Sequence, residues 1–306
     1  MTRRSRQVIL ISAFVALSLI PVANTFGQAT ETVTLKGISL GLVSATHQKE
    51  IEERFRDFVR YVGRKLSPAA DVEGRVVVAS TALQLAKLLE AKKVDFYMES
   101  PYPTYLINKQ GAAVLRLRRW KGGMADYRSI LFTEKDSGVK RLEDLRGKMI
   151  AFEDPGSTSG YFLPKVLLLK KGFRLAEKAG LEAKVAFSEI GYVFASSDRA
   201  IADWVLSKRV AAGAFSNDDF GALDEARKAV IAVLAETDSF PRHLVSTRRD
   251  LNPAVVKRLK EILLIMHQED EGRRILQQTD DTTKFDFLPG GEEKVRRQLV
   301  ELFRSR

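Results

Sequence analysis

The feature that most constrains the fold is a regular alternation of strand-like and helix-like hydrophobic patterns. Apolar and small residues alternate from Val33 to Val43, as on a strand. From Lys49 to Leu66 the apolar residues recur with a helical period, and charged residues occupy the opposite side. The alternation continues with strands at 75–78, 94–97 and 113–120 and helices at 81–91, where Thr81 can act as N-cap, and 103–109. This order predicts an α/β fold whose sheet is mainly parallel and carries helices on both faces.

The pattern restarts after Gly122-Gly123 and breaks again at Ser239-Phe240-Pro241. Between the breaks we expect strands at 127–133, 148–152, 185–187, 210–215 and 230–235, a helical turn at 142–145 and helices at 161–171 and 198–207. After the second break we expect a strand at 242–246 and helices at 253–267, 271–278 and 292–303. A chain that leaves one unit, builds another and returns has two crossing segments that can hinge. We therefore predict two lobes with a ligand cleft between them: lobe 1 from residues 30–122 and 240–306, and lobe 2 from residues 123–239.

The first 29 residues have the order of a secretory signal peptide. Three arginines among the first six residues precede an apolar run at Val8–Ala23, and small residues follow up to Ala29. The alternative, a transmembrane anchor, needs about 20 apolar residues. Two serines and Pro21 interrupt this run. We predict that residues 1–29 are cleaved after Ala29 and that the exported protein does not span the membrane.

The amino-acid composition excludes several kinds of functional site. The chain has 306 residues and no cysteine, which excludes disulfides, Cys-ligated zinc, iron–sulfur clusters and thiol nucleophiles. Only His47, His243 and His267 are available for histidine-based metal or proton-transfer sites. We therefore expect no metal, no cofactor and no catalytic residues.

The chain is basic, with 50 Lys+Arg against 39 Asp+Glu, so nucleic-acid binding has to be weighed. Most positive residues are interleaved with acidic residues on helix faces. The densest cluster, at 116–121, alternates partly with apolar residues, which is typical of an edge strand with a solvated face. We expect no nucleic-acid partner.

One loop carries three consecutive hydroxyl side chains between a predicted strand and a predicted helix. Ser157, Thr158 and Ser159 are flanked by Gly156 and Gly160. A helix N-terminus offers unpaired N–H groups and a partial positive charge, and the hydroxyls add donors that can turn toward the same point. The glycines allow the backbone to approach a ligand closely. This combination favours a tetrahedral oxyanion and needs no arginine.

Other known loops with similar residues fit less well. The Walker phosphate-binding loop is excluded because no Gly-Lys-Ser/Thr follows. A hydrolase elbow is excluded because Thr158 stands at the centre, where that motif has serine, and no histidine lies nearby. An ordinary capped helix after a Gly/Ser loop remains the alternative, although a cap would need only one hydroxyl.

A second candidate segment follows the strand at 94–97. Tyr97, Ser100 and Tyr102 supply hydroxyls at the carboxyl end of this strand, where open α/β sheets place ligands. The alternative is that the two tyrosines only pack against the core.

The two segments resemble those of the phosphate/phosphite/phosphonate-binding proteins of ABC transporters, which are type II periplasmic binding proteins. The resemblance rests on Phe-Glu-Asp-Pro before the Gly-Ser-Thr-Ser-Gly loop, Tyr-Phe-Leu-Pro after it, and the strand 94–97 with Ser100, and it extends over the mature chain. It implies a two-lobed clamp in which each lobe is a mixed sheet flanked by helices, with two hinge crossings. It also implies that residues 157–159 bind the P–O oxygens and that Tyr97 and Ser100 close from the other lobe.

Further positions are implied by the same resemblance. Where aminophosphonate binders carry a Ser-His-Glu-type segment, Ser197 stands at the histidine, and Asp218 resembles a later acidic position. A ligand ammonium would need facing carboxylates, so 2-aminoethylphosphonate is disfavoured. Thr46 and His47 end the first strand at another ligand-facing turn. Asp218 or Glu99 is a candidate acceptor for a ligand proton, which would select against fully ionised sulfate.

The resemblance implies a periplasmic protein, expected as a monomer, that captures a small phosphorus oxyanion and delivers it to an ABC transporter permease. Two alternatives remain open from the sequence: a module that presents its ligand to a periplasmic sensor or receptor, and a periplasmic phosphoester hydrolase. The hydrolase would need paired carboxylates or histidines at metal spacing, which the sequence lacks. The sequence does not specify which oxyanion is bound.

Overall fold

The computed structural model describes residues 36–67 and 72–304. The predicted signal peptide, residues 1–29, lies outside these ranges. Within them, no helix combines the length and the apolar character needed to cross a bilayer.

The first of two six-stranded sheets has the strand order β14-β4-β13-β3-β1-β2. β1 is parallel to β2 and β3, whereas β13 is antiparallel to β3 and β4, and β14 is antiparallel to β4. Because β13 is antiparallel to both β3 and β4, the four strands before the first break run in one direction, whereas β13 and β14 run against them. The mixed sheet that the resemblance implies is therefore confirmed. Its strands are β1 (Gly37–Val43), β2 (Glu73–Ala79), β3 (Phe96–Glu99), β4 (Ala113–Lys121), β13 (His243–Arg248) and β14 (Thr282–Phe287).

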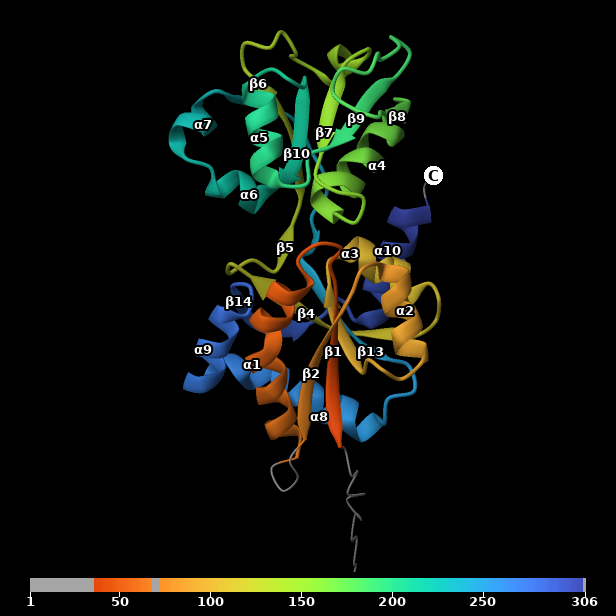
Figure 1. Ribbon diagram of the computed structural model, residues 1–306, viewed down its shortest axis with the longest axis vertical. Coiled ribbons are helices and arrows are strands. Elements are labelled where there is room, and N and C mark those ends of the chain that lie inside the picture. Colours follow the sequence, from red (N-terminus) through yellow and green to blue (C-terminus); the bar gives the residue numbers. More distant parts are fainter. Residues whose placement is uncertain (1–35, 68–71, 305–306) are drawn as a thin grey trace, which may run out of the picture. The chain divides into compact units, whose positions relative to one another are not determined.

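Helices flank this sheet, with α1 and α9 on one side and α2 and α10 on the other (Figure 1). The predicted cap of α2 is confirmed, since Thr81 Oγ1 accepts a hydrogen bond from Gln84 N at 3.1 Å. The helical elements here are α1 (Gln48–Leu66), α2 (Ala82–Glu90), α3 (Pro101–Asn108), α8 (Pro253–Ile265), η3 (Met266–Gln268), α9 (Asp270–Gln278) and α10 (Glu292–Arg304).

The second sheet has the order β11-β6-β10-β7-β9-β8. β7 is parallel to β10 and β9, and β8 is parallel to β9, whereas β6 is antiparallel to β10 and β11. Its strands are β6 (Ser129–Glu134), β7 (Met149–Phe152), β8 (Leu175–Glu177), β9 (Ile190–Phe194), β10 (Ala212–Ser216) and β11 (Ile231–Glu236). The accompanying helical elements are η1 (Leu142–Leu145), η2 (Thr158–Phe162), α4 (Leu163–Lys170), α5 (Asp198–Leu206), α6 (Asn217–Ala222) and α7 (Glu225–Ala229).

Two short segments connect the sheets and pair with each other. β5 (Asp126–Tyr127) and β12 (Phe240–Pro241) form an antiparallel ribbon, with Tyr127 opposite Phe240. Arg242, which follows β12, donates its backbone N–H to Ala125 O at 2.8 Å. Both crossings of the chain are therefore tied together at one place.

The structure corrects the strand predicted at 185–187. That segment is irregular, and Phe187 is 80% exposed. The strands beyond β7 are β9 and, at the edge of the sheet, β8. β14 of the first sheet was also missed. Short strands of three to six residues carry too few alternating positions for a reliable periodicity.

The prediction that the arginines at 116–121 lie on a solvated edge strand is wrong. β4 lies inside the sheet between β14 and β13, and Arg119 is 1% exposed. Arg119 Nη2 donates to Asp280 Oδ2 at 2.9 Å. Arg118 donates to Asp286 at 2.7 Å and to Asp126 at 3.0 Å. These carboxylates compensate two guanidinium charges that β4 buries.

An aromatic cluster joins elements of both sheets. We define it as Tyr102 and Tyr105 of α3, Phe162 of η2 and Phe303 of α10. The rings of Tyr102 and Phe162 stack at 4.2 Å between centroids, and Phe303 lies 4.4 Å from Phe162 and 4.9 Å from Tyr105. Val166 of α4 joins the same core. Helix α10 therefore contacts helical elements that accompany both sheets.

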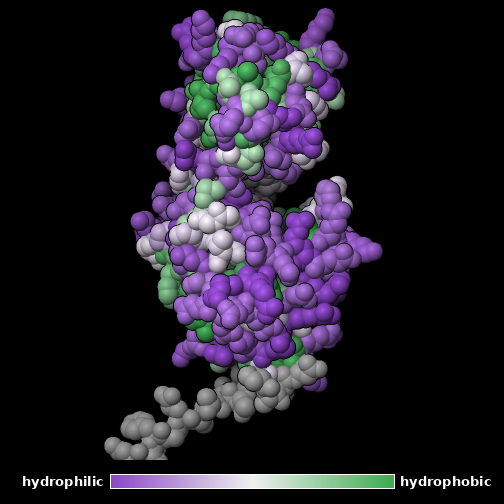
Figure 2. Space-filling model, turned by 90° about the vertical axis from the view of Figure 1, so that its left-hand side faces the viewer, coloured by the Kyte–Doolittle hydropathy of each residue, from purple (hydrophilic) through white to green (hydrophobic). Residues whose placement is uncertain are grey.

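The surface seen in Figure 2 is mostly hydrophilic. Hydrophobic residues on this face gather mainly in its upper part. Charged and polar side chains cover the rest, as the amphipathic helix patterns predict.

Candidate functional site

The loop between β7 and η2 is stabilised by its own hydrogen bonds. Ser157 Oγ accepts from Gly160 N at 2.9 Å and donates to Glu153 Oε2 at 2.7 Å. A Cβ at Gly160 would lie 2.5 Å from the Cβ of Glu153, so this close approach requires glycine. Burial raises the pKa of Glu153 to about 7, although the bond from Ser157 acts to lower it. The Ser157 hydroxyl thus serves the loop itself.

Thr158 connects this loop to the start of α3. Its side chain is almost fully buried, at 2% exposure. Its Oγ1 accepts from Tyr102 N at 2.9 Å and donates to Ser100 Oγ at 2.9 Å. Two of the predicted site segments, far apart in sequence, are therefore in direct contact.

The sequence predicts that the three hydroxyls of the loop turn toward one point. In the structure they do not. Ser157 bonds within the loop, and Thr158 bonds to α3. Ser159 contributes its backbone carbonyl, which accepts from Ser129 Oγ at 2.6 Å. Only Thr158 among them reaches the other candidate segment through a hydrogen bond.

The carboxyl ends of β1 and β3 contribute Glu99 and the turn that holds Thr46 and His47. Glu99 Oε1 accepts from Val43 N at 2.6 Å. Burial raises the pKa of Glu99 to about 7, opposed by the backbone N–H groups of Val43 and Ser100. Thr46 and His47 are exposed, and Thr46 Oγ1 lies 2.8 Å from His47 Nδ1. These two residues lie at the expected edge of the sheet but bond to each other.

Tyr97 lies in the core of the first sheet, and its role as a ligand contact stays a prediction. It is fully buried among apolar side chains between β3 and α2, and its hydroxyl donates to Asn108 Oδ1 at 2.7 Å. Ser197 caps α5, where its Oγ accepts from Ala200 N at 3.2 Å. A role of Ser197 in ligand binding stays a prediction.

Asp218 is paired with an arginine. Its Oδ1 accepts from Ser216 Oγ at 2.6 Å and forms an ion pair with Arg242 Nη1. The Arg242 guanidinium lies over the ring of Tyr127, 5.3 Å from the centroid. Arg242 and Tyr127 are 6% and 4% exposed.

Sequence reasoning missed Arg242 and Tyr127. The available signal was their position, since each lies beside one of the two breaks in the alternating pattern. Residues at such crossings meet only when the chain returns, so neither could be assigned a partner from the sequence.

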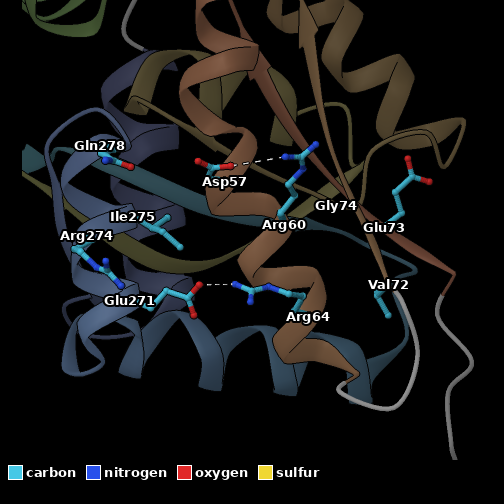
Figure 3. A pocket seen from close by; sticks show the side chains of 10 residues that line it. All are labelled: Asp57, Arg60, Arg64, Val72, Glu73, Gly74, Glu271, Arg274, Ile275 and Gln278. Atoms are coloured by element: carbon cyan, nitrogen blue, oxygen red, sulfur yellow. Dashed lines mark hydrogen bonds and ion pairs between the residues drawn. The ribbon is translucent and has the colours of Figure 1, made fainter.

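A cavity of about 640 Å³ lies elsewhere, between α1, β2 and α9 (Figure 3). It is lined by three arginines and three carboxylates, and Arg64 pairs with Glu271 at 2.7 Å. The predicted site residues do not line it. Across residues 36–67 and 72–304, no three His, Asp or Glu side chains are grouped so that they could hold a metal ion.

Comparisons with known proteins agree on one family. The sequence profile of "ABC transporter, phosphonate, periplasmic substrate-binding protein" matches residues 40–287. The "Phosphate-import protein PhnD" of Mycolicibacterium smegmatis is 23% identical over 185 residues, which cover 58% of this chain. That match spans only 56% of the relative's length.

Solved structures share the fold. XAC2383 from Xanthomonas citri, bound to ATP, is 27% identical with a TM-score of 0.79, covering 88% of this chain and 96% of that one. PhnD1 from Prochlorococcus marinus, in complex with methylphosphonate, is 15% identical with a TM-score of 0.63, covering 89% and 99%. The two mixed sheets with flanking helices are thus the type II periplasmic binding protein fold. The chain belongs to the family of periplasmic phosphonate substrate-binding proteins of ABC transporters.

Proposed function

We propose that the protein captures a small phosphorus oxyanion, namely a phosphonate, phosphite or phosphate, and delivers it to the permease of an ABC importer in the periplasm. Family membership supports this role over a sensor module or a hydrolase. We infer that residues 1–29 direct export and that the two sheets mark two lobes hinged near β5 and β12.

The observation that carries the proposal is the contact of Thr158 with Ser100 and Tyr102. It assembles two hydroxyls and one backbone N–H, at the ends of β3 and β7, where α/β sheets place ligands. These groups can exchange their mutual bonds for bonds to an oxyanion. Bonds to an anion contribute about 1.5–3 kcal/mol each, compared with about 1 kcal/mol for a neutral pair.

The ligand class is tested by calorimetry of the purified protein against phosphate, phosphite, methylphosphonate, 2-aminoethylphosphonate, sulfate and ATP. ATP is included because XAC2383 was solved with it. Micromolar or tighter binding of one phosphorus oxyanion, with weaker sulfate binding, supports the proposal. Absence of binding by every phosphorus compound, or equal binding of sulfate, overturns it.

The role of Thr158 is tested by Thr158→Val, with Thr133→Val as the matched control. Thr133 is equally buried, and its hydroxyl donates to Ala211 O at 2.7 Å. It lies near the opposite end of β6 from Ser129, whose hydroxyl bonds to the loop. We expect each variant to lose about 1–3 kcal/mol of unfolding free energy. Only Thr158→Val should weaken ligand binding, by at least tenfold, and an unchanged affinity would contradict the assignment.

A further inference from the structure

Two buried polar groups in the segments that connect the sheets have no hydrogen-bond partner among the described residues. They are the hydroxyl of Tyr127 and the Nε of Arg242. The Nη1 of Arg242 meets Asp218 as an ion pair but without hydrogen-bond geometry. Leaving such groups unsatisfied in a protein interior costs free energy, and the cost is largest for a charged group.

Both groups adjoin a candidate site residue, since Arg242 pairs with Asp218 and its guanidinium lies over the ring of Tyr127. Burial raises the pKa of the Tyr127 hydroxyl, and the nearby Thr158 side chain acts to lower it. Thr158 donates its own proton to Ser100 and accepts from Tyr102 N, so it does not donate to Tyr127. Tyr127 and Arg242 come from the two segments that connect the sheets, held together by β5 and β12. Their placement therefore depends on both crossings of the chain.

We propose that Arg242 and Tyr127 are ligand-binding residues that donate to an oxygen of the phosphorus oxyanion. Arg242 supplies the only positive charge that faces the Tyr127 ring among the described residues. Its planar guanidinium is suited to oxyanions, since one donor can pair with Asp218 while another binds the ligand. The proposal rests on the proposed function and adds a cationic contact that the hydroxyl loop does not provide.

The same ion pair limits the class of ligand. Asp218 already accepts from Ser216 and faces Arg242, so its charge is compensated. A ligand ammonium placed there would compete with the guanidinium. The site therefore selects phosphite, phosphate or a simple alkylphosphonate over an aminoalkylphosphonate.

The test measures affinity and stability of Tyr127→Phe and Arg242→Gln. Tyr127→Phe removes a hydroxyl that bonds to no protein group, so we expect unchanged or slightly higher stability together with an approximately tenfold loss of methylphosphonate affinity. Arg242→Gln should weaken methylphosphonate by at least tenfold while weakening 2-aminoethylphosphonate less, because the carboxylate of Asp218 is released. A purely structural role for Arg242 would not change this ratio.

Arg118→Gln is the control, because Arg118 is a buried arginine and each of its three nitrogens donates to Asp126 or Asp286. We expect it to lower stability without changing the ligand ratio. If the unmodified protein binds methylphosphonate and Tyr127→Phe and Arg242→Gln keep its affinity and ratio, the assignment is overturned while the proposed function stands. If the unmodified protein binds no phosphorus oxyanion, the proposed function itself fails.

Discussion

Replacing Asp280 by asparagine should reveal how strongly the fold depends on one buried ion pair. Arg119 has a side chain that is 2% exposed, and Asp280 is its only carboxylate partner in the described structure. Asp280 also binds Lys121 Nζ at 2.9 Å. Asparagine preserves shape and tolerates the positive φ of 52° at this position, so the substitution removes mainly the charge.

The expected loss of unfolding free energy depends on the hydrogen bonds that Arg119 keeps after the substitution. Removing one partner of a buried pair costs about 3–5 kcal/mol. Arg119 keeps bonds to the carbonyl of Asp280 at 2.8 Å and to Thr282 Oγ1 at 2.7 Å, so the lower end applies. We expect the unfolding free energy at pH 7 to fall by about 3 kcal/mol.

The loss should also depend on pH. Burial opposes ionisation of Asp280, but Arg119 and Lys121 outweigh it and hold the pKa of that carboxyl well below its usual value of 3.8. A lowered folded-state pKa adds stability above the unfolded pKa, and this stability is lost as the pH falls toward the folded pKa. The difference between Asp280→Asn and the parent should therefore shrink in acid.

Urea unfolding at several pH values from neutral to acid measures both effects. Asp270→Asn is the control, because Asp270 forms an ion pair with Arg273 while its side chain is 91% exposed. It should change stability by less than about 0.5 kcal/mol. A loss below about 1 kcal/mol for Asp280→Asn, or a loss that does not change with pH, would refute the reasoning.

Two further predictions concern stability. Burial raises the pKa of Glu99 from 4.5 to about 7, so its contribution to stability is complete below pH 4.5 and is lost as the pH rises through 7. Glu99→Gln should remove about 3 kcal/mol of that pH dependence in urea titrations, and an identical pH profile would contradict this. Phe303→Ala should lower stability by about 3–5 kcal/mol, because Phe303 is 3% exposed in the aromatic cluster. The same change at Phe287, which is 63% exposed, should cost under about 1 kcal/mol in thermal unfolding, and equal losses would argue against the cluster's role.

Helices were easier to predict from the sequence than strands. The helix predicted at 49–66 is observed at Gln48–Leu66, because an amphipathic period repeated over several turns is unambiguous. β14, with the sequence Thr-Thr-Lys-Phe-Asp-Phe, offers few alternating positions and was not predicted. The direction of β13 could not be predicted from the sequence either, since it depends on how the chain re-enters the first sheet.

Burial of charge was the least predictable feature. Arg119 lies in a run that is typical of a solvated strand, and its partner Asp280 is 161 residues away along the chain. The candidate site shows the same limit. The loop containing Thr158 and the cap containing Ser100 were located by local residue types, whereas Tyr127 and Arg242 come together only through the pairing of β5 with β12.

The stacking of Tyr102 on Phe162 has a consequence for the speed of ligand exchange. Tyr102 holds Thr158 through its backbone N–H while its ring stacks on Phe162, so any motion that frees the Thr158 hydroxyl also disturbs the stack. In the proposed capture of an oxyanion by Thr158, uptake and release would both require this aromatic stack to be disturbed. Association rate constants should consequently rise more steeply on warming than the viscosity of water alone would allow.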